Sequence, residues 1–206
     1  MNTGDTAFMM ICAALVFFMT PGLAFFYGGL VRRKNVCNTI MACVAIMGLS
    51  VVMWTLFGYS LSFGGNHAGI IGDFRWFGLN GVGMEAGPYA DSIPHLVFCA
   101  FQMMFAMITP ALITGSLVGR MKFKALFLFV AIWSVIVYYP MAHMVWGDGG
   151  FLAAIGSVDF AGGDVVHISS GISALVLAII LGRRRGYEHT TYRIHNIPSV
   201  VLGASL

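Results

Sequence analysis

The stretch VVHISSGISALVLAIILG at residues 165–182 contains no Asp, Glu, Lys or Arg and is followed at once by the arginines of residues 183–185. A helix rises about 1.5 Å per residue, so about 20 apolar residues cross the hydrocarbon part of a bilayer. Uncharged apolar runs of this kind recur along the chain and predict five membrane-spanning helices, with a sixth apolar run that starts near Ile197 and is cut off at Leu206. The predicted spans are 6–31, 36–62, 92–119, 125–147 and 160–182, with a truncated one at 197–206.

The composition indicates an integral membrane protein and argues against other classes. Of the 206 residues, 59% are hydrophobic and 9% are charged, and the mean hydropathy is +0.87. A soluble domain carries about 25% charged residues, and a disordered chain is more polar still. The net charge is only +3, and the basic residues lie in short loops, so no nucleic-acid partner is expected. We expect one all-α transmembrane domain over residues 1–206, with no metal, no cofactor and no enzymatic activity.

The basic residues predict the orientation in the membrane. Ten of the eleven Lys and Arg residues fall in clusters at 32–34, 120–124 and 183–193, and five crossings place all three clusters on one side. Cytoplasmic loops are enriched in Lys and Arg, so this side is predicted to be cytoplasmic and the N-terminus to lie outside. Only Arg75 lies on the opposite side, and only Glu188 among the acidic residues lies with the clusters. The expected location is the cytoplasmic membrane.

Prolines and small residues indicate that the spans pack as a bundle. Pro21, Pro110 and Pro140 each lie inside a predicted span, where each is expected to mark a kink beside another helix. Gly115 and Gly119 form a GxxxG pair, which predicts a close helix contact. The four cysteines have no metal-ligand spacing and are interpreted as small packing residues. They are Cys12, Cys37, Cys43 and Cys99.

Three ionisable residues near the fifth span are candidates for a functional role. His167 lies inside the span, where an ionisable group usually faces a cavity or a partner; a neutral histidine bonded to another helix fits the residues equally well. Asp159 lies eight residues earlier and is also typical of a carboxylate that caps the start of a helix. Asp164 either influences the protonation of His167 or faces outer water in the first helical turn, and the second interpretation is favoured.

Two aromatic residues and one histidine have both a structural and a functional interpretation. Trp146 ends the fourth span, where a tryptophan usually anchors the helix at the membrane interface; the alternative is an aromatic face that recruits a cation. Phe105, in the middle of the third span, is typical of helix packing. His143, three residues before Trp146, is interpreted as a structural hydrogen-bonding residue. From position alone the structural interpretations are preferred.

Five stretches resemble the signatures of the ammonium transporter (Amt/Mep/Rh) family and occur in the family's order. They are TPGLAFFYGGLVRRKN (20–35), FQMMFAMITPALITG (101–115), AHMVWGDGG (142–150), DFAGGDVVHISSG (159–171) and HNIPSVVLGASL (195–206). The resemblance implies an eleven-helix fold whose first ten helices form two five-helix repeats of inverted topology. It also implies a homotrimer with one pore in each subunit. The chain is then the first repeat plus the start of helix six.

The resemblance implies roles for four residues. Trp146 matches the tryptophan of the outer recruitment site, and Phe105 matches the first phenylalanine of the pair that closes the pore. His167 matches the first of the twin histidines of the narrow lumen, and Asp159 matches the carboxylate that shapes the outer site. The second histidine, the second phenylalanine and the outer-site serine lie in the family beyond Leu206. We therefore expect that this polypeptide alone does not conduct.

The predicted function is passage of ammonium or ammonia through a hydrophobic, histidine-lined pore after recruitment and deprotonation at an aromatic site. An ammonium-sensor module of a signalling protein and a truncated, inactive product are the alternatives. The resemblance also implies a PII-type regulator at the basic loops. Two departures from the family have open effects: Val118-Gly119-Arg120 stands where Ala-Glu-Arg is frequent, and Asp164 replaces a small neutral residue.

Overall fold

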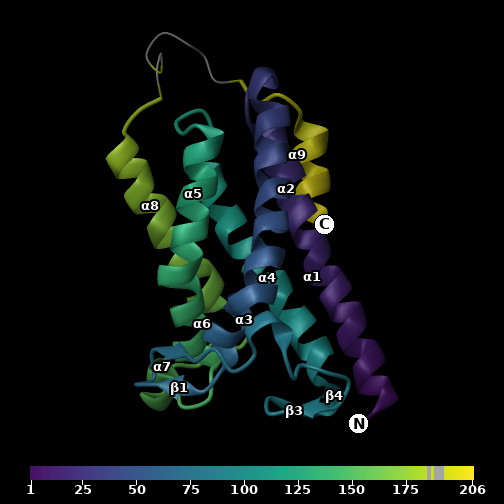
Figure 1. Ribbon diagram of the computed structural model, residues 1–206. Helices are drawn as coiled ribbons and strands as arrows, with labels where there is room; N and C mark the ends of the chain where they lie inside the picture. Colours follow the sequence, from purple (N-terminus) through teal and green to yellow (C-terminus); the bar gives the residue numbers. More distant parts are fainter. Residues whose placement is uncertain (185–186, 188–192) are drawn as a thin grey trace.

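The computed structural model describes residues 1–184, 187 and 193–206, and it is mostly helical (Figure 1). Within these residues, five helical segments are long and apolar enough to cross a membrane. They are Thr3–Leu30, Arg33–Phe63, His95–Leu117, Phe123–Ala154 and Gly163–Leu181. The predicted all-α membrane fold with five spans is confirmed.

The first and third spans are single helices, α1 (Thr3–Leu30) and α4 (His95–Leu117). The other three contain a π-helical turn, in which one additional residue is accommodated. The second span consists of η1 (Arg33–Asn35), α2 (Val36–Met53), the π turn η2 (Trp54–Gly58) and α3 (Tyr59–Phe63). The fourth consists of α5 (Phe123–Trp133), the π turn η4 (Ser134–Tyr138), α6 (Tyr139–Trp146) and, after a tight turn, α7 (Phe151–Ala154). The last elements are the π turn η5 (Gly163–Ile168), α8 (Ser169–Leu181) and α9 (Ile197–Ser205).

Two short antiparallel hairpins connect the second span to the third. The strands are β1 (Asn66–His67) with β2 (Ile71–Gly72), and β3 (Ala86–Gly87) with β4 (Ala90–Pro94), separated by η3 (Phe77–Leu79). The hairpins, α7 and the N-terminus lie together at one end of the bundle, which we call the hairpin end (Figure 1). The opposite end holds residues 31–35, 118–122 and 182–184, and we call it the basic end.

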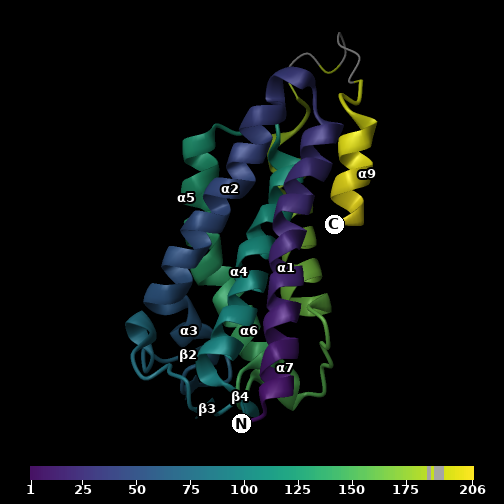
Figure 2. The ribbon, with the colours of Figure 1, turned by 90° about the vertical axis from the view of Figure 1, so that its right-hand side faces the viewer.

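Helix α4 lies inside the bundle and packs against α1, α2 and α8, while α9 lies against α1 (Figure 2). The contact between α1 and α4 depends on Gly115, because a Cβ atom there would lie 2.6 Å from the Tyr27 ring. The Tyr27 hydroxyl donates a hydrogen bond to the Leu112 carbonyl at 2.9 Å. Ring and glycine thus fix the distance between the two helices that flank the cavity described below.

The second glycine of the predicted GxxxG pair does not take part in a helix contact, so that prediction is wrong for Gly119. Helix α4 ends at Leu117, and Val118 has left the helical region with φ −56° and ψ 124°. Gly119 has φ +72°, in the left-handed region that glycine adopts without a steric penalty. It therefore forms the turn toward α5.

Two of the three prolines lie inside α-helices, and the third follows a π turn. Pro21 is within α1 and Pro110 within α4, whereas Pro140 is the second residue of α6, two positions after the last residue of η4. Proline has no N–H group to donate to the preceding turn of a helix. At Pro140 this missing donor coincides with the place where the π turn already changes the hydrogen-bond pattern.

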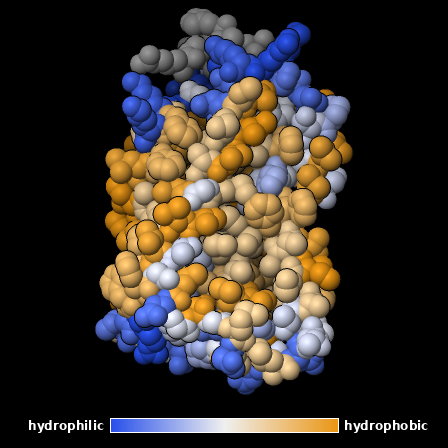
Figure 3. All heavy atoms as spheres, turned by 45° about the vertical axis from the view of Figure 1, so that its right-hand side comes forward, coloured by the Kyte–Doolittle hydropathy of each residue, from blue (hydrophilic) through white to orange (hydrophobic). Residues whose placement is uncertain are grey.

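The surface and the interior both fit a protein that crosses a bilayer several times. On the face that Figure 3 shows, a broad hydrophobic band crosses the middle of the molecule, and hydrophilic residues gather at the two ends. Inside, Tyr59 and Tyr139 are completely buried and pack against Trp54, whose indole N–H donates to the Cys99 carbonyl at 3.2 Å. The chain is a multi-pass membrane protein.

Candidate functional site

A cavity of about 580 Å³ lies between α1, α4, the start of the fifth span and α9. Phe105 enters its wall from α4, and His167 enters from η5. Most of the remaining wall is apolar. It consists of Met19, Leu23, Phe26, Ile108, Leu112, Ala161, Val166, Gly203, Ala204, Ser205 and Leu206. Among these wall residues His167 alone carries an ionisable side chain, so it is the candidate for chemistry inside the cavity.

Trp146 is placed next to Phe105, outside the cavity wall. The two rings have centroids 6.0 Å apart and an interplanar angle of 63°, which is an edge-to-face contact. Phe105 also contacts Phe101 edge-to-face at 5.2 Å. Phe105 therefore separates the Trp146 ring from the cavity that contains His167. Trp146 packs onto the bundle and does not simply extend toward lipid, as an interfacial anchor would.

The Asp159 carboxylate is occupied by four backbone N–H groups at the start of the fifth span. Its Oδ1 atom accepts from Gly162 at 2.6 Å and from Gly163 at 2.8 Å. Its Oδ2 atom accepts from Asp164 at 2.8 Å and from Val165 at 2.9 Å. The first N–H groups of a helix have no partner within the helix, and a carboxylate there satisfies them and opposes the helix dipole. The side chain thus acts as a cap, which was one of its two sequence interpretations.

The same residue also holds the tryptophan. The indole Nε1 of Trp146 donates to the backbone carbonyl of Asp159 at 3.0 Å. Through its side chain Asp159 organises the turn that leads to His167, and through its main chain it fixes the Trp146 ring. Asp159 is absent from the cavity wall. It connects two candidate residues and does not itself face the cavity.

The turn before His167 requires glycine. Gly162 has φ +91°, and a Cβ atom at this position would lie 2.8 Å from Cγ2 of Val166. Both Val166 and His167 direct their N–H groups to the Gly162 carbonyl at 3.0 Å, which is the mixed pattern of a π turn. This turn sets the direction of the imidazole. His167 lines the cavity, and its ring makes no hydrogen bond to any described residue.

Asp164 and His143 have structural partners. Asp164 lies in the first turn of η5, where its Oδ2 atom accepts from the Ser157 hydroxyl at 2.7 Å, and it is not part of the cavity wall. His143 is completely buried, with Nδ1 3.1 Å from the Ser62 carbonyl and Nε2 3.3 Å from Oδ1 of Asn66. The interpretation of His143 as a structural hydrogen-bonding residue is confirmed.

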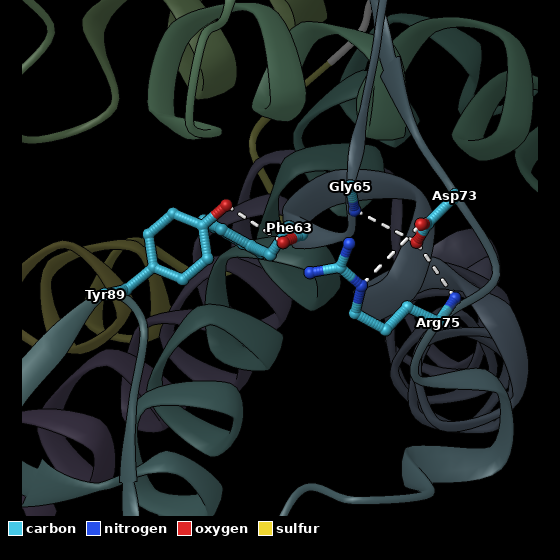
Figure 4. Close-up of polar contacts among 5 residues, drawn as sticks. All are labelled: Phe63, Gly65, Asp73, Arg75 and Tyr89. Atoms are coloured by element: carbon cyan, nitrogen blue, oxygen red, sulfur yellow. Dashed lines mark hydrogen bonds and ion pairs between the residues drawn. The ribbon is translucent and has the colours of Figure 1, made fainter.

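Polar contacts around the Asp73 carboxylate hold the loop at the hairpin end (Figure 4). The Asp73 carboxylate accepts from the Gly65 N–H at 3.0 Å and the Arg75 N–H at 2.9 Å, and it also lies 3.7 Å from Nε of Arg75. Partial burial alone would raise the pKa of Asp73, but these two N–H groups and the nearby charges of Arg75 and His67 lower it overall. The loop therefore stabilises the ionised form of the Asp73 carboxylate.

Tyr89 connects the second hairpin to the turn after α6. Its hydroxyl donates to the Phe63 carbonyl at 2.9 Å and accepts from the Asp148 N–H at 3.1 Å (Figure 4 shows the first of these). Its ring stacks on Phe98 with centroids 5.3 Å apart and an interplanar angle of 4°. Burial raises the pKa of Tyr89, so the phenol keeps the proton that it donates.

Two groups of residues near the site were not identified as candidates from the sequence. The α1 face of the cavity, including Leu23 and Phe26, lies within the TPGLAFFYGG stretch but carries no polar signal of its own. Asn66 lies in β1, 80 residues before Trp146, and only the folded chain shows that it reaches the end of α6. No local sequence pattern predicts such a contact.

Five helices of membrane-crossing length within the described residues, with an apolar cavity that contains one histidine, define a multi-pass membrane protein with an internal cavity. The family follows from sequence comparison. A sequence model of the Ammonium Transporter Family matches residues 7–206, and the chain belongs to this family.

Curated relatives agree along the whole chain. It is 50% identical over 206 residues to an ammonium transporter of Bacillus subtilis (strain 168), a match that covers 100% of this chain and 50% of that protein. It is 47% identical over 226 residues to an ammonium transporter of Mycobacterium tuberculosis (strain H37Rv), covering 98% of this chain and 47% of that protein. The chain spans about half the length of the curated relatives it matches.

Solved structures show the same fold. Candida albicans Mep2 superimposes with a TM-score of 0.85 at 31% identity, covering 100% of this chain and 46% of that one. Saccharomyces cerevisiae Mep2 gives 0.85 at 34% identity, covering 97% and 46%. A structure described as a sensor Amt protein also gives 0.85, at 28% identity, and covers 96% and 50%.

Proposed function

We propose that the chain forms the first half of a path for ammonium and ammonia across the cytoplasmic membrane, with the hairpin end outside. The observation that supports this most strongly is the order of three residues. Trp146 contacts Phe105 from outside the cavity, and Phe105 and His167 share the cavity wall. Relatives that match the whole chain are named ammonium transporters, so the proposed solute agrees with the family.

The chemistry of the site favours a solute that can lose its charge. Ammonium and potassium are similar in size, so a hole alone cannot separate them, but only ammonium can release a proton. The Trp146 ring attracts a cation with about 0.5–2 kcal/mol, depending on how far the cation is desolvated. An apolar cavity opposes any ion that keeps its charge, whereas neutral ammonia avoids most of that penalty. A neutral His167 offers ammonia a hydrogen bond and gives a proton a place to move.

Orientation, assembly and regulation are parts of the same proposal. The basic end carries most of the Lys and Arg residues, which supports a cytoplasmic location for it and an outside N-terminus. We propose a homotrimer and, at the basic loops, a PII-type regulatory partner. Membrane-impermeant maleimide labelling of intact cells tests the orientation: Asn80→Cys at the hairpin end reacts if this end is outside, and fails to react if the orientation is inverted.

The direct test is ammonium current or labelled methylammonium uptake by the full-length product of the gene that encodes this chain. Trp146→Leu and His167→Ala are expected to lower the rate or the selection of ammonium over potassium. Phe160→Leu and His67→Ala are matched controls, because Phe160 is 99% exposed and His67 is also exposed. If the two site variants transport with unchanged rate and selection, the assigned roles are wrong.

A second candidate function is ammonium sensing. The similarity to the sensor Amt protein favours it, because the same helices serve there in a protein described as a sensor. A sensor module binds ammonium with little transport and is joined to a signalling domain. Uptake by the full-length protein at a rate that depends on Trp146 supports the transporter, whereas saturable binding without uptake supports the sensor.

A further inference from the structure

The Asn66 side chain contacts the chain on both sides of Trp146. Its Nδ2 atom donates to the Gly149 carbonyl at 2.9 Å, and its Oδ1 atom lies 3.3 Å from Nε2 of His143. His143 is three residues before Trp146, and Gly149 is three residues after it. One amide in the first hairpin therefore packs against the last turn of α6 and hydrogen-bonds to the turn that follows it.

The orientation of this amide is fixed although Asn66 is an exposed residue. Its Oδ1 atom accepts from the Gly69 N–H at 2.6 Å, while its Nδ2 atom donates to the Gly149 carbonyl. Rotating the amide by half a turn would place an NH2 group against an N–H group and an oxygen against a carbonyl. Both hydrogen bonds would be lost together, so the side chain stays in one orientation.

The histidine on the other side of Trp146 is equally constrained. The Ser62 carbonyl can only accept, so Nδ1 of His143 carries a proton and donates to it. With its proton on Nδ1, the neutral ring has none on Nε2, so the 3.3 Å approach of Nε2 to Oδ1 of Asn66 is a packing contact, which becomes a hydrogen bond only when the ring carries both protons. The buried ring is thus held between α3 and β1, and α6 cannot turn about its axis without displacing it.

Two further hydrogen bonds fix the turn after Trp146 to the hairpins. The Asp148 N–H donates to the Tyr89 hydroxyl at 3.1 Å, and the Phe151 N–H donates to the Gly69 carbonyl at 2.8 Å. Of the contacts described for residues 143–151, that of Asn66 alone reaches both sides of Trp146 through one side chain. It is therefore the hairpin side chain whose removal loosens the chain on both sides of the tryptophan.

We propose that Asn66 is a positioning residue for Trp146: it holds the end of α6 so that the indole stays edge-on to Phe105 and hydrogen-bonded to Asp159. This inference rests on the proposed function of Trp146 as the recruitment site. Removing the Asn66 side chain lets the Trp146 ring leave its position. This weakens capture of the cation but leaves the cavity beyond Phe105 unchanged. Asn66 therefore controls the ammonium concentration for half-maximal uptake more than the maximal rate.

Transport by the full-length protein tests the functional part. In Asn66→Ala the half-saturating methylammonium concentration is expected to rise about fivefold, while the maximal rate per folded protein changes by less than about twofold. Asn80→Ala is the matched control. Asn80 is an exposed asparagine of the same end, and its side chain makes no hydrogen bond to any described residue. A fall in maximal rate with an unchanged half-saturating concentration overturns the proposal.

Fluorine NMR of protein labelled with 5-fluorotryptophan tests the structural part separately. The chain has four tryptophans, and Trp146→Phe identifies the resonance of Trp146. Asn66→Ala is expected to shift or broaden this resonance, and Asn80→Ala to leave it in place. Asn66→Asp keeps the oxygen that faces Gly69 and His143 but loses the donor to Gly149, so its effect is expected to be intermediate. An unmoved Trp146 resonance in both folded Asn66 variants overturns the proposal.

The two experiments separate the two ways of failing. If Trp146→Leu transports normally while Asn66→Ala moves the Trp146 resonance, the recruitment role of Trp146 is wrong, and with it the claim that Asn66 controls uptake. If Trp146→Leu is impaired while Asn66→Ala moves neither the resonance nor the half-saturating concentration, Trp146 keeps its role and the positioning by Asn66 is wrong.

Discussion

The indole Nε1 of Trp146 donates its hydrogen bond to the main-chain carbonyl of Asp159, 3.0 Å away, and not to the carboxylate. The carboxylate is used by the four N–H groups at the start of η5. A single residue thus couples the aromatic ring at the hairpin end to the turn that directs His167. Changes to the ring, to the cap and to the turn have separable consequences.

Trp146→Phe keeps an aromatic ring beside Phe105 but has no N–H group for the Asp159 carbonyl. We expect the half-saturating ammonium concentration of the full-length protein to rise by about three- to tenfold, the loss that corresponds to one hydrogen bond. Trp146→Leu, which also removes the π face, should be affected more. Equal effects of the two substitutions in uptake assays would mean that the hydrogen bond to Asp159 contributes nothing.

Asp159→Asn places an NH2 group against two of the four capping N–H groups and removes the negative charge from the helix start. We expect the free energy of unfolding to fall by about 1–3 kcal/mol, measured by chemical unfolding in detergent micelles. Asp164→Asn is the control, since its amide oxygen still accepts from Ser157, and its effect should stay within about 0.5 kcal/mol. A stable Asp159→Asn protein would contradict the capping role.

Gly162→Ala forces an L residue into φ +91° and brings a methyl group against Val166. We expect a loss of about 1–2 kcal/mol in stability, together with reduced uptake, because the turn before His167 changes. Gly171→Ala in α8 has free space around the added methyl group and an ordinary helical backbone, so it should be neutral or slightly stabilising. Thermal unfolding of the pair checks this, and equal midpoints would refute it.

The lowered pKa of Asp73 predicts that the stability of the hairpin end depends on pH. Its pKa is lower in the folded protein than in the unfolded chain, so its contribution to stability is fully present above the unfolded pKa, near 4 by the usual value. The contribution is lost as the pH falls through the lower, folded pKa. The thermal unfolding midpoint of the protein should decrease as the pH is lowered from about 5 to about 3. Asp73→Asn should reduce the slope of the midpoint against pH. Identical slopes would exclude Asp73 as a source.

The helical architecture follows from where the charges are absent. Uncharged stretches of about 20 residues that end in clusters such as Arg32–Lys34 have the length of a bilayer-spanning helix, in which every backbone group is satisfied within the segment. The five spans were therefore predictable. Gly119 was misjudged because the GxxxG pattern assumes a continuous helix, and nothing local reveals that α4 ends two residues earlier, at Leu117.

The candidate residues could be named from the sequence, but their arrangement in the folded chain could not. The resemblance pointed to Trp146, Phe105, His167 and Asp159, yet only the folded chain shows that Asp159 faces N–H groups and not the cavity. Asn66 could not be found from the sequence, because its contacts join residues separated by 77 and 83 positions. Contacts over such distances depend on how α3 and α6 pack together.

The π turn at Ser134–Tyr138 has a consequence for comparing and engineering chains of this kind. A π turn is an α-helix that has accepted one surplus residue, and each residue rotates a helix by about 100°. Because the π turn absorbs this surplus residue locally, deleting one residue of η4 is expected to convert it to regular helix and to leave the later side chains of α6, Trp146 included, facing as they do now. A homologue that is one residue shorter here is therefore expected to place its tryptophan as this chain does, and its alignment needs a one-residue gap inside the turn.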